Sequence, residues 1–230
     1  MAENLRVAVA GAMGRMGTTA RDALLRTGEY CCGLARRADA ERGIVDSVDA
    51  MIAQRPDVLL DLTTRPGSPQ IALAVVERGV PVVVGASGWS DAERAALDAA
   101  AKQRNVGALL VPNFSIGAVL MMRFAQEAAR YFPHAEIVEL HHAEKKDKPS
   151  GTARETAARM ERNGARAAIH SLRLPGALAH QEVVFGGTGE LLTIRHDSLS
   201  RESFVAGMLA AVRGVGNLRG LHVGLETVLP

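Results

Sequence analysis

The chain has 230 residues, which is enough for one or two domains with a substantial core. Hydrophobic residues make up 47% and charged residues 23%, ordinary values for a globular protein in water. The net charge of +2 and the 3% of aromatic residues indicate neither electrostatic binding nor base stacking to nucleic acid. No apolar run reaches the roughly 18 residues of a membrane span, and Met1–Asn4 lacks the features of a signal peptide. We therefore expect a cytoplasmic protein without nucleic-acid or membrane partners.

Buried strands alternate with helices in the first half of the chain. Strands are expected at 5–10, 31–35, 58–62, 81–84 and 106–111. Helices are expected from Met16 to Gly28, from Ile71 to Gly79 and after a capping box of Ser90 and Glu93. Such alternation predicts a parallel sheet with right-handed crossovers. The adjacent Cys31 and Cys32 are interpreted as small buried strand residues, because a disulfide between neighbours is strained.

The pattern changes after Pro112. A helix at 117–131, a strand ending at His142, a helix at 152–162 and strands at 171–174, 181–185 and 191–195 are expected. Strands grouped in this way predict an α+β domain with an open, mixed or mostly antiparallel sheet, and the apolar helix 204–212 is expected to return to the first domain. The predicted protein is thus α/β: a Rossmann-like domain at 1–112, completed by 204–230, and a second domain at 113–203.

A glycine-rich turn, 11–17, lies between the first strand and the first helix. Its glycines allow a tight turn, and the helix N-terminus offers N–H groups to a pyrophosphate. The spacing G-x-x-G-x-x-G is one residue wider than the common fingerprint, so a tight connection without a ligand is the alternative. Its position at the start of an α/β domain favours a dinucleotide.

The end of the second strand indicates which nucleotide binds. A carboxylate there suits the ribose hydroxyl of NAD, whereas arginine suits the 2′-phosphate of NADP. The segment runs Leu34-Ala35-Arg36-Arg37 without an acid before Asp39. We hypothesise that Arg36, with Arg37 or Arg15, binds the phosphate of NADPH; the alternative is a solvated basic pair. Small residues after two further strands, at 61–64 and 85–88, would admit a nicotinamide ribose, whereas Trp89 is expected to pack.

Proton donors gather after the apolar run 137–140. His141, His142 and Lys145 are followed by Pro149-Ser150-Gly151-Thr152. Hydride addition beside an imine or enamine leaves an anion that an acid must protonate, and histidine or a lysine among other cations suits this task. Because Lys145, Lys146 and Lys148 crowd together, one of them is a candidate; a solvated loop is the alternative.

The segment after Pro149 is expected to bind a carboxylate. Thr152 and Glu155 are predicted to form a capping box, so that the helix presents N–H groups beside the hydroxyls of Ser150 and Thr152. No metal site is predicted, because His141 and His142 on a strand point to opposite faces.

These motifs resemble the 4-hydroxy-tetrahydrodipicolinate reductase family, also called dihydrodipicolinate reductase. The resemblance runs from Val7 to about Leu229, and its most specific segments are 11–17, 112–117 and 139–153, with 181–187 and 194–198 in support. It implies an NADPH-dependent reduction, with NADH also possible, of a cyclic dicarboxylate to tetrahydrodipicolinate in lysine and diaminopimelate biosynthesis. It also implies a homotetramer joined through the sheet of the second domain, which therefore serves substrate binding and oligomerisation.

The resemblance assigns roles residue by residue. It implies catalysis by His141 and Lys145, with Lys145 as the better acid, and substrate carboxylates at His142, Ser150, Gly151 and Thr152. It implies cofactor contacts at Gly11, Ala12, Met13, Gly14, Arg15, Met16, Arg36, Gly85, Ala86, Ser87, Val111, Pro112, Asn113 and Phe114.

The chain departs from the family in three places. It is shorter, with the shortening expected between Arg42 and Asp57; Gly-Ala-Ser-Gly at 85–88 replaces the commoner Gly-Thr-Thr-Gly; and Ala35 stands where an acid often occurs. The shortening and Ala35 bear on the choice between NADH and NADPH, whereas the change at 85–88 removes two methyl groups and one hydroxyl near the expected nicotinamide. Two other functions stay open: another NADPH-dependent imine or semialdehyde reductase, and a non-catalytic NADPH sensor, although no helix-turn-helix with a basic recognition helix is found.

Overall fold

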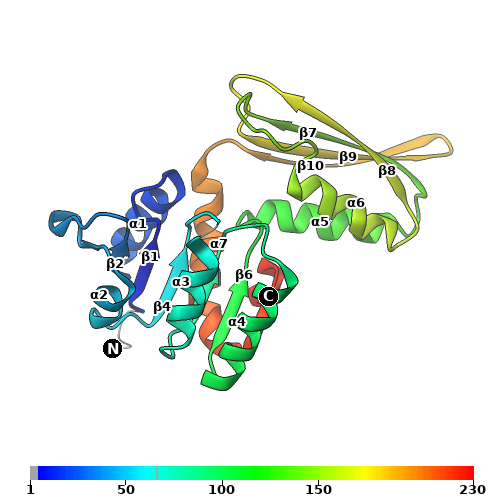
Figure 1. The fold of residues 1–230 in the computed structure, drawn as a ribbon. Helices are drawn as coiled ribbons and strands as arrows, with labels where there is room; N and C mark the ends of the chain where they lie inside the picture. The colour runs from blue at the N-terminus through cyan, green and yellow to red at the C-terminus, as the bar shows by residue number, and fades with distance from the viewer. Residues whose placement is uncertain (1–4, 66) are drawn as a thin grey trace. The chain divides into compact units, whose positions relative to one another are not determined.

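The computed structural model describes residues 5–65 and 67–230, and the chain divides into two compact units. Unit 1 comprises Met1–Phe114 and Phe204–Pro230, and unit 2 comprises Ser115–Ser203. The chain therefore leaves unit 1 once and returns to it once, as the colours of Figure 1 allow the reader to follow.

Unit 1 is built on a seven-stranded sheet with the order β11-β6-β5-β4-β1-β2-β3, and its pairs are all parallel. The strands are β1 (Val7–Ala10), β2 (Tyr30–Leu34), β3 (Ile44–Val45), β4 (Val58–Asp61), β5 (Val82–Val84), β6 (Gly107–Leu110) and β11 (Gly220–Val223). Strands β1, β4, β5 and β6 are buried at every position, because helices cover both faces. This confirms the predicted Rossmann-like sheet. Its strand order reverses between β1 and β4, where such sheets bind ligands.

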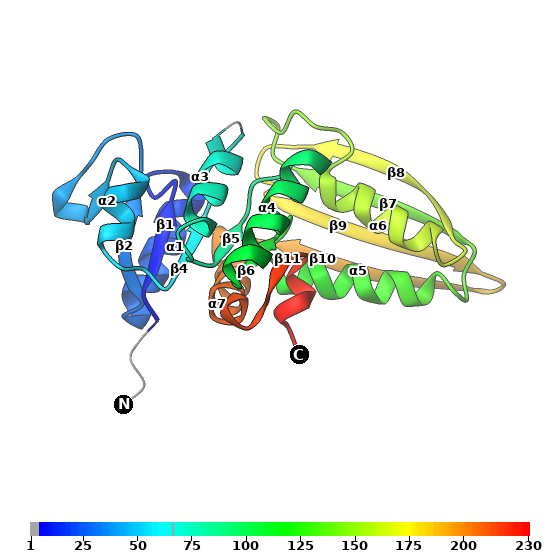
Figure 2. The ribbon, with the colours of Figure 1, turned by 60° about the horizontal axis from the view of Figure 1, so that its bottom comes forward.

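The helices of unit 1 flank this sheet. They are α1 (Arg15–Thr27), α2 (Val48–Ala53), α3 (Gly67–Val76), α4 (Asp91–Arg104) and α7 (Val205–Gly214), with 3₁₀ turns at Ala40–Arg42, Arg201–Phe204, Val215–Asn217 and Leu225–Val228. Helix α1 packs against α7, whereas α3 contacts both α2 and α4; α3 and α4 lie side by side in Figure 2. The capping box of Ser90 and Glu93 and the end of α1 at Gly28 are confirmed, and Gly28 takes a left-handed conformation there.

Several short elements of unit 1 lie outside the predicted pattern. Strand β3 has two residues, α2 has six, and β11 includes Gly220 and His222, so none offers a long apolar period. Helix α3 begins at Gly67 rather than at Ile71, because Ser68 and Pro69 occupy its first turn.

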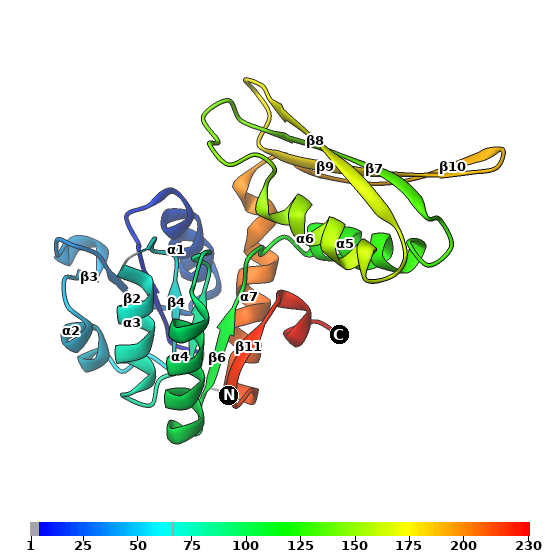
Figure 3. The ribbon, with the colours of Figure 1, turned by 45° about the vertical axis from the view of Figure 1, so that its right-hand side comes forward.

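Unit 2 has a mixed sheet with helices on one face, as Figure 3 shows. Its elements are α5 (Ile116–Ala128), β7 (His134–His141), α6 (Gly151–Glu161), β8 (Arg166–Arg173), β9 (Ala179–Gly187) and β10 (Glu190–Ser198). The order is β10-β9-β7-β8, in which only the β7–β8 pair is parallel. Ile137, Val183 and Phe185 form the core beneath α5 and α6. The predicted open mixed sheet is thus confirmed, while β8 begins at Arg166 rather than at 171, because alternating exposed residues such as His170 interrupt its apolar signal.

Helix α7 packs unusually close to the chain segment that follows β6. A Cβ atom built on Gly207 would lie 1.9 Å from the carbonyl oxygen of Phe114 and 2.8 Å from Leu225 Cδ2. The backbone oxygen cannot rotate away as a side chain would, so this position requires glycine although it lies inside a helix. The helix that follows Phe204 therefore packs on unit 1 with its backbone in direct contact with the backbone of Phe114.

We predict that Gly207→Ala lowers the free energy of unfolding by about 1–3 kcal/mol, although alanine favours a helix, because the added methyl overpacks this contact. Urea unfolding measures the change. Gly216→Ala is the matched control, since a Cβ there meets nothing within 4 Å. Equal stability of the Gly207→Ala variant and the wild type would contradict the close approach.

Candidate active site

The carboxyl ends of four neighbouring strands bring four turns of unit 1 to one edge of the sheet. Leu62 N donates to Ala10 O at 3.0 Å, Gly85 N to Asp61 O at 2.9 Å and Val111 N to Val84 O at 2.8 Å. The turns that begin at Gly11, Leu62, Gly85 and Val111 are thereby aligned side by side. The structure thus gathers the predicted cofactor segments at the strand ends where open α/β sheets bind ligands, and Arg36 follows the end of the neighbouring strand β2.

The turn after β1 depends on close backbone contacts. Gly11 has φ +76°, and a Cβ on it would lie 2.9 Å from Leu62 O; a Cβ on Gly17 would lie 2.1 Å from Gly11 O. Gly14 N donates to Gly11 O at 2.8 Å, and Gly14 caps α1 without any side-chain hydrogen bond. The first turn of α1 therefore begins with backbone N–H groups rather than a side-chain cap, as an anion site at a helix N-terminus requires.

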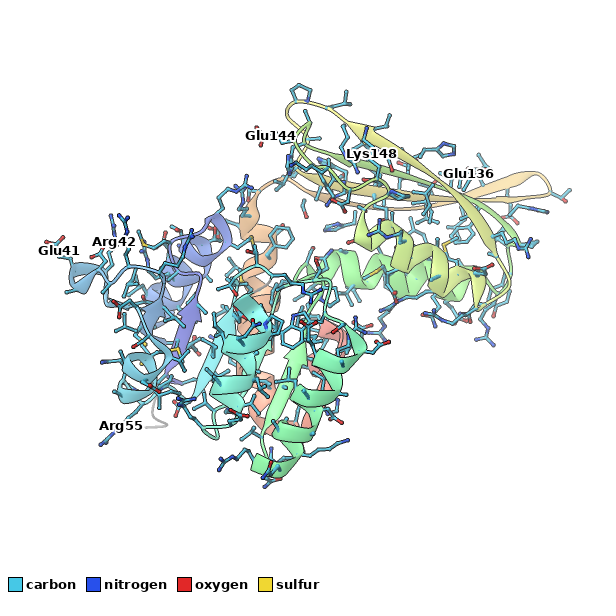
Figure 4. The ribbon with its side chains drawn as sticks, viewed as in Figure 1. Glu41, Arg42, Arg55, Glu136, Glu144 and Lys148 are labelled. Carbon is cyan, nitrogen blue, oxygen red and sulfur yellow. The ribbon has the colours of Figure 1, made fainter. Side chains whose placement is uncertain are left out.

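Exposed cations follow this turn and the end of the neighbouring strand β2. Arg15, Arg36 and Arg37 are exposed, and no acid occurs in the first turn of α1. Asp39, the first carboxylate after β2, pairs with Arg42 at 2.9 Å. Figure 4 labels Arg42 with its neighbour Glu41 at the tip of this segment. The residues therefore fit a nucleotide whose phosphates carry negative charge.

The other turns of this edge are held by specific packing and hydrogen bonds. A Cβ on Gly85 would meet the ring of Phe114 at 2.8 Å, so the ring packs directly on this turn. Arg65 joins the turn after β4 to Glu93 at 2.6 Å and to the carbonyl oxygen of Gly88. Trp89 is buried in the hydrophobic core, as predicted.

Asp61 lies fully buried beneath the turn after β4. Its carboxyl group accepts from Thr63 N at 2.9 Å and from Ser68 Oγ at 2.5 Å. Burial raises its pKa, and the hydrogen bonds from Ser68 and Thr63 oppose this rise. Asp61 thus ties the turn to the start of α3.

Unit 2 holds a buried ionic cluster at the end of β7. Glu139 is completely buried, and its two carboxylate oxygens accept from Arg173 Nη1 at 3.0 Å and Nη2 at 2.9 Å. Oε2 also bonds His141 Nδ1, and Oε1 accepts from Ser150 N at 3.2 Å. One carboxylate therefore connects β7, β8 and the start of α6.

The charges of this cluster follow from its contacts. Burial raises the pKa of Glu139, but the hydrogen bonds from Arg173, Ser171 and His141 outweigh it and leave the pKa below its usual value. Burial lowers the pKa of His141, although Glu139 acts against this. Near neutral pH the cluster therefore holds a carboxylate and a neutral imidazole.

The loop at 142–150 carries the predicted acid. Lys145 N donates to His142 O at 3.1 Å, and Lys145 Nζ pairs with Asp147 Oδ1 at 2.8 Å. The Lys145 side chain is about a quarter exposed, whereas Lys146 and Lys148 are exposed. Figure 4 labels Glu144 and Lys148 on this loop. The structure thus brings Lys145 and His141 into one loop and strand end of unit 2.

The predicted capping box at the start of α6 is wrong. Ser150, not Thr152, caps the helix by accepting from Ala153 N at 3.1 Å, and Glu155 pairs with Arg159 at 2.8 Å instead of reaching back. The helix begins at Gly151 because Ser150 takes the extended conformation of a cap. A Cβ on Gly151 would meet nothing within 4 Å, so the N-terminus of α6 is open at this residue.

No cluster of three or more His, Cys, Asp or Glu residues is placed to hold a metal ion among residues 5–65 and 67–230. In the same part of the chain, no helix is long and apolar enough to cross a membrane.

Sequence reasoning missed Glu139, Arg173 and Asp61. Glu139 could have been found from its spacing. It lies two residues after Ile137 and four after Ala135, so all three side chains point to the same buried face of the strand. An acid on the core face of a strand demands a partner, and Arg173 supplies it from β8.

Comparisons with known proteins agree over both units. Residues 5–114 match the family model described as dihydrodipicolinate reductase, N-terminus, and residues 117–229 match the model of its C-terminus. The 4-hydroxy-tetrahydrodipicolinate reductase of Moorella thermoacetica is 43% identical, with 100% of this chain and 99% of the relative covered. That of Bacillus cereus is 39% identical, with 99% of each covered.

A solved structure of a relative resembles the whole chain. It is a dihydrodipicolinate reductase from Paenisporosarcina sp. TG-14 with dipicolinate bound, 33% identical, with a TM-score of 0.87 over 98% of this chain and 100% of that one. The alignment with the Moorella thermoacetica relative extends over 265 positions, more than the residues of this chain, so the chain lacks residues that this relative has.

Proposed function

This chain belongs to the dihydrodipicolinate reductase family, and from that premise we propose how its residues carry out the reaction. The activity is the NAD(P)H-dependent reduction of 4-hydroxy-tetrahydrodipicolinate in lysine biosynthesis. The observation that carries the assignment of roles is the placement of Lys145 beside a neutral, carboxylate-bound His141 and the open N-terminus of α6. Family membership favours this reductase over another imine or semialdehyde reductase and over a nucleotide sensor.

Unit 1 is proposed to bind NADPH at the carboxyl edge of its sheet. The proposed contacts are Gly11, Ala12, Met13, Gly14, Arg15, Met16, Arg36, Gly85, Ala86, Ser87, Val111, Pro112, Asn113 and Phe114. When bound, the reduced nicotinamide supplies the hydride. Backbone N–H groups at the start of α1 bind the pyrophosphate, and exposed Arg36 binds the 2′-phosphate. Asp39, the first carboxylate after β2, is paired with Arg42, so it is not offered to the ribose hydroxyl of NADH. NADH remains the second choice.

Lys145 is proposed to supply the proton. Loss of the 4-hydroxyl group as water leaves a conjugated imine. Hydride addition to this imine leaves an electron pair on the substrate, and an ammonium on a flexible stem can deliver a proton to it. His141 is the poorer donor, because burial lowers its pKa and its Nδ1 is engaged by Glu139. We assign His141 to the catalytic pair as the group that contacts the reacting ring.

Two carboxylates of the substrate are proposed to bind at His142, Ser150, Gly151 and Thr152. The N-terminus of α6 favours an anion, and Gly151 leaves room for its approach. The Ser150 oxygen accepts from Ala153 N, so its hydroxyl hydrogen is the part that would serve the substrate. The relative from Paenisporosarcina binds dipicolinate, which is also a ring with two carboxylates.

We further propose that the protein is a cytoplasmic homotetramer assembled through unit 2. One face of its sheet is covered by α5 and α6, and within the described part of unit 2 the opposite face has no covering element. Exposed side chains such as Glu136 and Arg195 alternate there with half-buried ones such as Val138 and Val184. A second copy of this sheet would cover that face.

We predict that the protein oxidises NADPH when substrate is made in situ from pyruvate and aspartate semialdehyde by the preceding synthase. The loss of absorbance of the reduced nicotinamide measures this turnover.

Arg36→Ala should raise the KM for NADPH by about 10–100-fold and leave the KM for NADH nearly unchanged, because a charge-assisted bond to the phosphate is lost. A wild type that strongly prefers NADH, or equal losses with both cofactors, would contradict the role of Arg36.

Lys145→Ala is expected to lower kcat by about 10²–10⁴-fold with NADPH binding intact, because general acid catalysis contributes on this order. Stopped-flow turnover and NADPH fluorescence titration measure the two quantities. Lys146→Ala, one residue away and exposed, should keep wild-type kcat. Loss of rate in the Lys146 variant instead would move the acid to that residue.

Thr152→Ala should raise the KM for the substrate by about tenfold with a smaller change in kcat, since one hydrogen bond to a carboxylate is lost. Thr152→Ser keeps the hydroxyl and should recover most of the binding. Steady-state kinetics over substrate concentration decides. A serine variant as weak as the alanine variant would assign the effect to packing of the methyl group instead.

A further inference from the structure

Beneath the proposed catalytic groups, Glu139 and Arg173 form an ion pair that has no substrate-binding role in the assignment above. The Glu139 side chain is 0% exposed and that of Arg173 is 6% exposed. The pair is bidentate, with both carboxylate oxygens accepting from the guanidinium. Its position on the helix-facing side of β7 and β8 places it at the start of the loop that carries Lys145.

The carboxylate determines which nitrogen of His141 carries a proton. An ionised carboxylate only accepts hydrogen bonds, so His141 Nδ1, which contacts Glu139 Oε2, must be the donor. In the neutral imidazole, Nε2 then holds a lone pair. The His141 side chain is 14% exposed, so the ring is largely enclosed apart from a small accessible surface. His141 thus presents an acceptor, and proton delivery falls to Lys145.

Arg173 and Glu139 also hold both parts of the 142–150 loop. Arg173 Nε donates to Lys145 O at 3.3 Å, and its Nη2 donates to Asp147 O at 2.6 Å. Glu139 Oε1 accepts from Ser150 N at 3.2 Å, where the loop enters α6. The backbone at Lys145 and the backbone at the carboxylate turn are therefore tied to the same buried pair.

We propose that Glu139 and Arg173 are positioning residues, which fix His141 as its Nδ1–H tautomer and hold the backbone of Lys145 and Ser150 in the geometry of the reaction. The proposal rests on the function proposed above. A pair with a merely structural role would contribute to stability, but it would not set the tautomer of His141 or change kcat in a folded enzyme.

The first test is the tautomer of His141 in the wild type. Long-range ¹H–¹⁵N correlation spectra of protein labelled at histidine distinguish Nδ1–H from Nε2–H, and His141→Asn assigns the signal. We expect the Nδ1–H tautomer with Nε2 unprotonated near neutral pH. A signal of the Nε2–H tautomer would overturn the proposal whether or not any variant of the ion pair folds.

The second test is Glu139→Gln. An amide has one acceptor oxygen where the carboxylate has two, so it cannot accept from His141 and from Ser150 together. We expect kcat to fall by about 10–100-fold, the effect of a small misplacement of reacting groups, while the Kd for NADPH, which unit 1 binds, stays unchanged. Glu155→Gln in helix α6 is the matched control. The half-exposed Glu155 pairs with Arg159 and not with the buried cluster, so this change should leave kcat at the wild-type value.

The pH profile separates positioning from stability. Three charged groups act on His141: Glu139 on its own strand raises its pKa, whereas Lys145 in the loop and Arg173 on β8 lower it, together with burial. Removing the charge of Glu139 removes a contribution that raises the pKa. Protonation of His141 at low pH removes the lone pair on Nε2 and is expected to lower kcat/KM. Because the pKa of His141 falls in Glu139→Gln, this loss of kcat/KM should occur at lower pH in the variant than in the wild type.

Arg173→Lys serves as the second variant in case Glu139→Gln does not fold. It keeps a cation opposite Glu139 but loses the planar fork that reaches Lys145 O and Asp147 O. We expect a lower kcat with NADPH binding intact. The proposal would be overturned if the folded variants kept the kcat and the pH profile of the wild type. It would also be overturned if the fraction of unfolded protein accounted for the whole loss of activity.

A wild type that shows the Nδ1–H tautomer but does not reduce the substrate would contradict the proposed function and not the tautomer assignment.

Discussion

A charged carboxylate in a protein interior must be compensated by its immediate neighbours, and the arrangement of unit 2 around Glu139 follows from this requirement. The side chain is fully buried beside Ile137, so Arg173, His141 and Ser150 N must satisfy it. These partners come from the next strand, the same strand and the start of a helix. These contacts bring the ends of β7 and β8 and the first turn of α6 together. The contacts that compensate the buried charge are therefore the same ones that hold the proposed reacting groups.

Unit 1 meets its own requirement by different means. The edge of its sheet proposed for the cofactor relies on glycine, where Gly11 and Gly17 permit backbone to approach backbone. Its buried carboxyl, Asp61, is satisfied by hydroxyl and amide groups rather than by a cation, which agrees with its raised pKa. Backbone N–H groups suit the permanent negative charge of a phosphate, whereas the titratable groups of unit 2 suit chemistry in which a proton moves.

The sequence allowed the α/β class and the mixed sheet to be predicted, because long apolar periods mark their strands and helices. Glycine and serine signals located the turns that carry the candidate site residues, whose roles stay predictions. Strand β11 was not predicted, because Gly220 and His222 interrupt its apolar pattern and its sequence looks like that of a loop. Only pairing with β6 makes this segment a strand. The cap at Ser150 was assigned to Thr152, because both precede a plausible helix and only the backbone conformation decides between them. Glu139 escaped since Arg173 lies far away in sequence, and the pairing of β7 with β8 brings the two together.

The interrupted course of unit 1 also orders events during synthesis. Residues 115–203 are contiguous, so unit 2 can fold as soon as it leaves the ribosome, whereas unit 1 lacks α7 and β11 until the segment after Ser203 has been made. Until Gly220–Val223 emerge, β6 is an unpaired edge of buried residues with a row of free backbone groups. Pairing with Gly220–Val223 thus removes a strand edge through which nascent chains on one polysome could otherwise pair with one another.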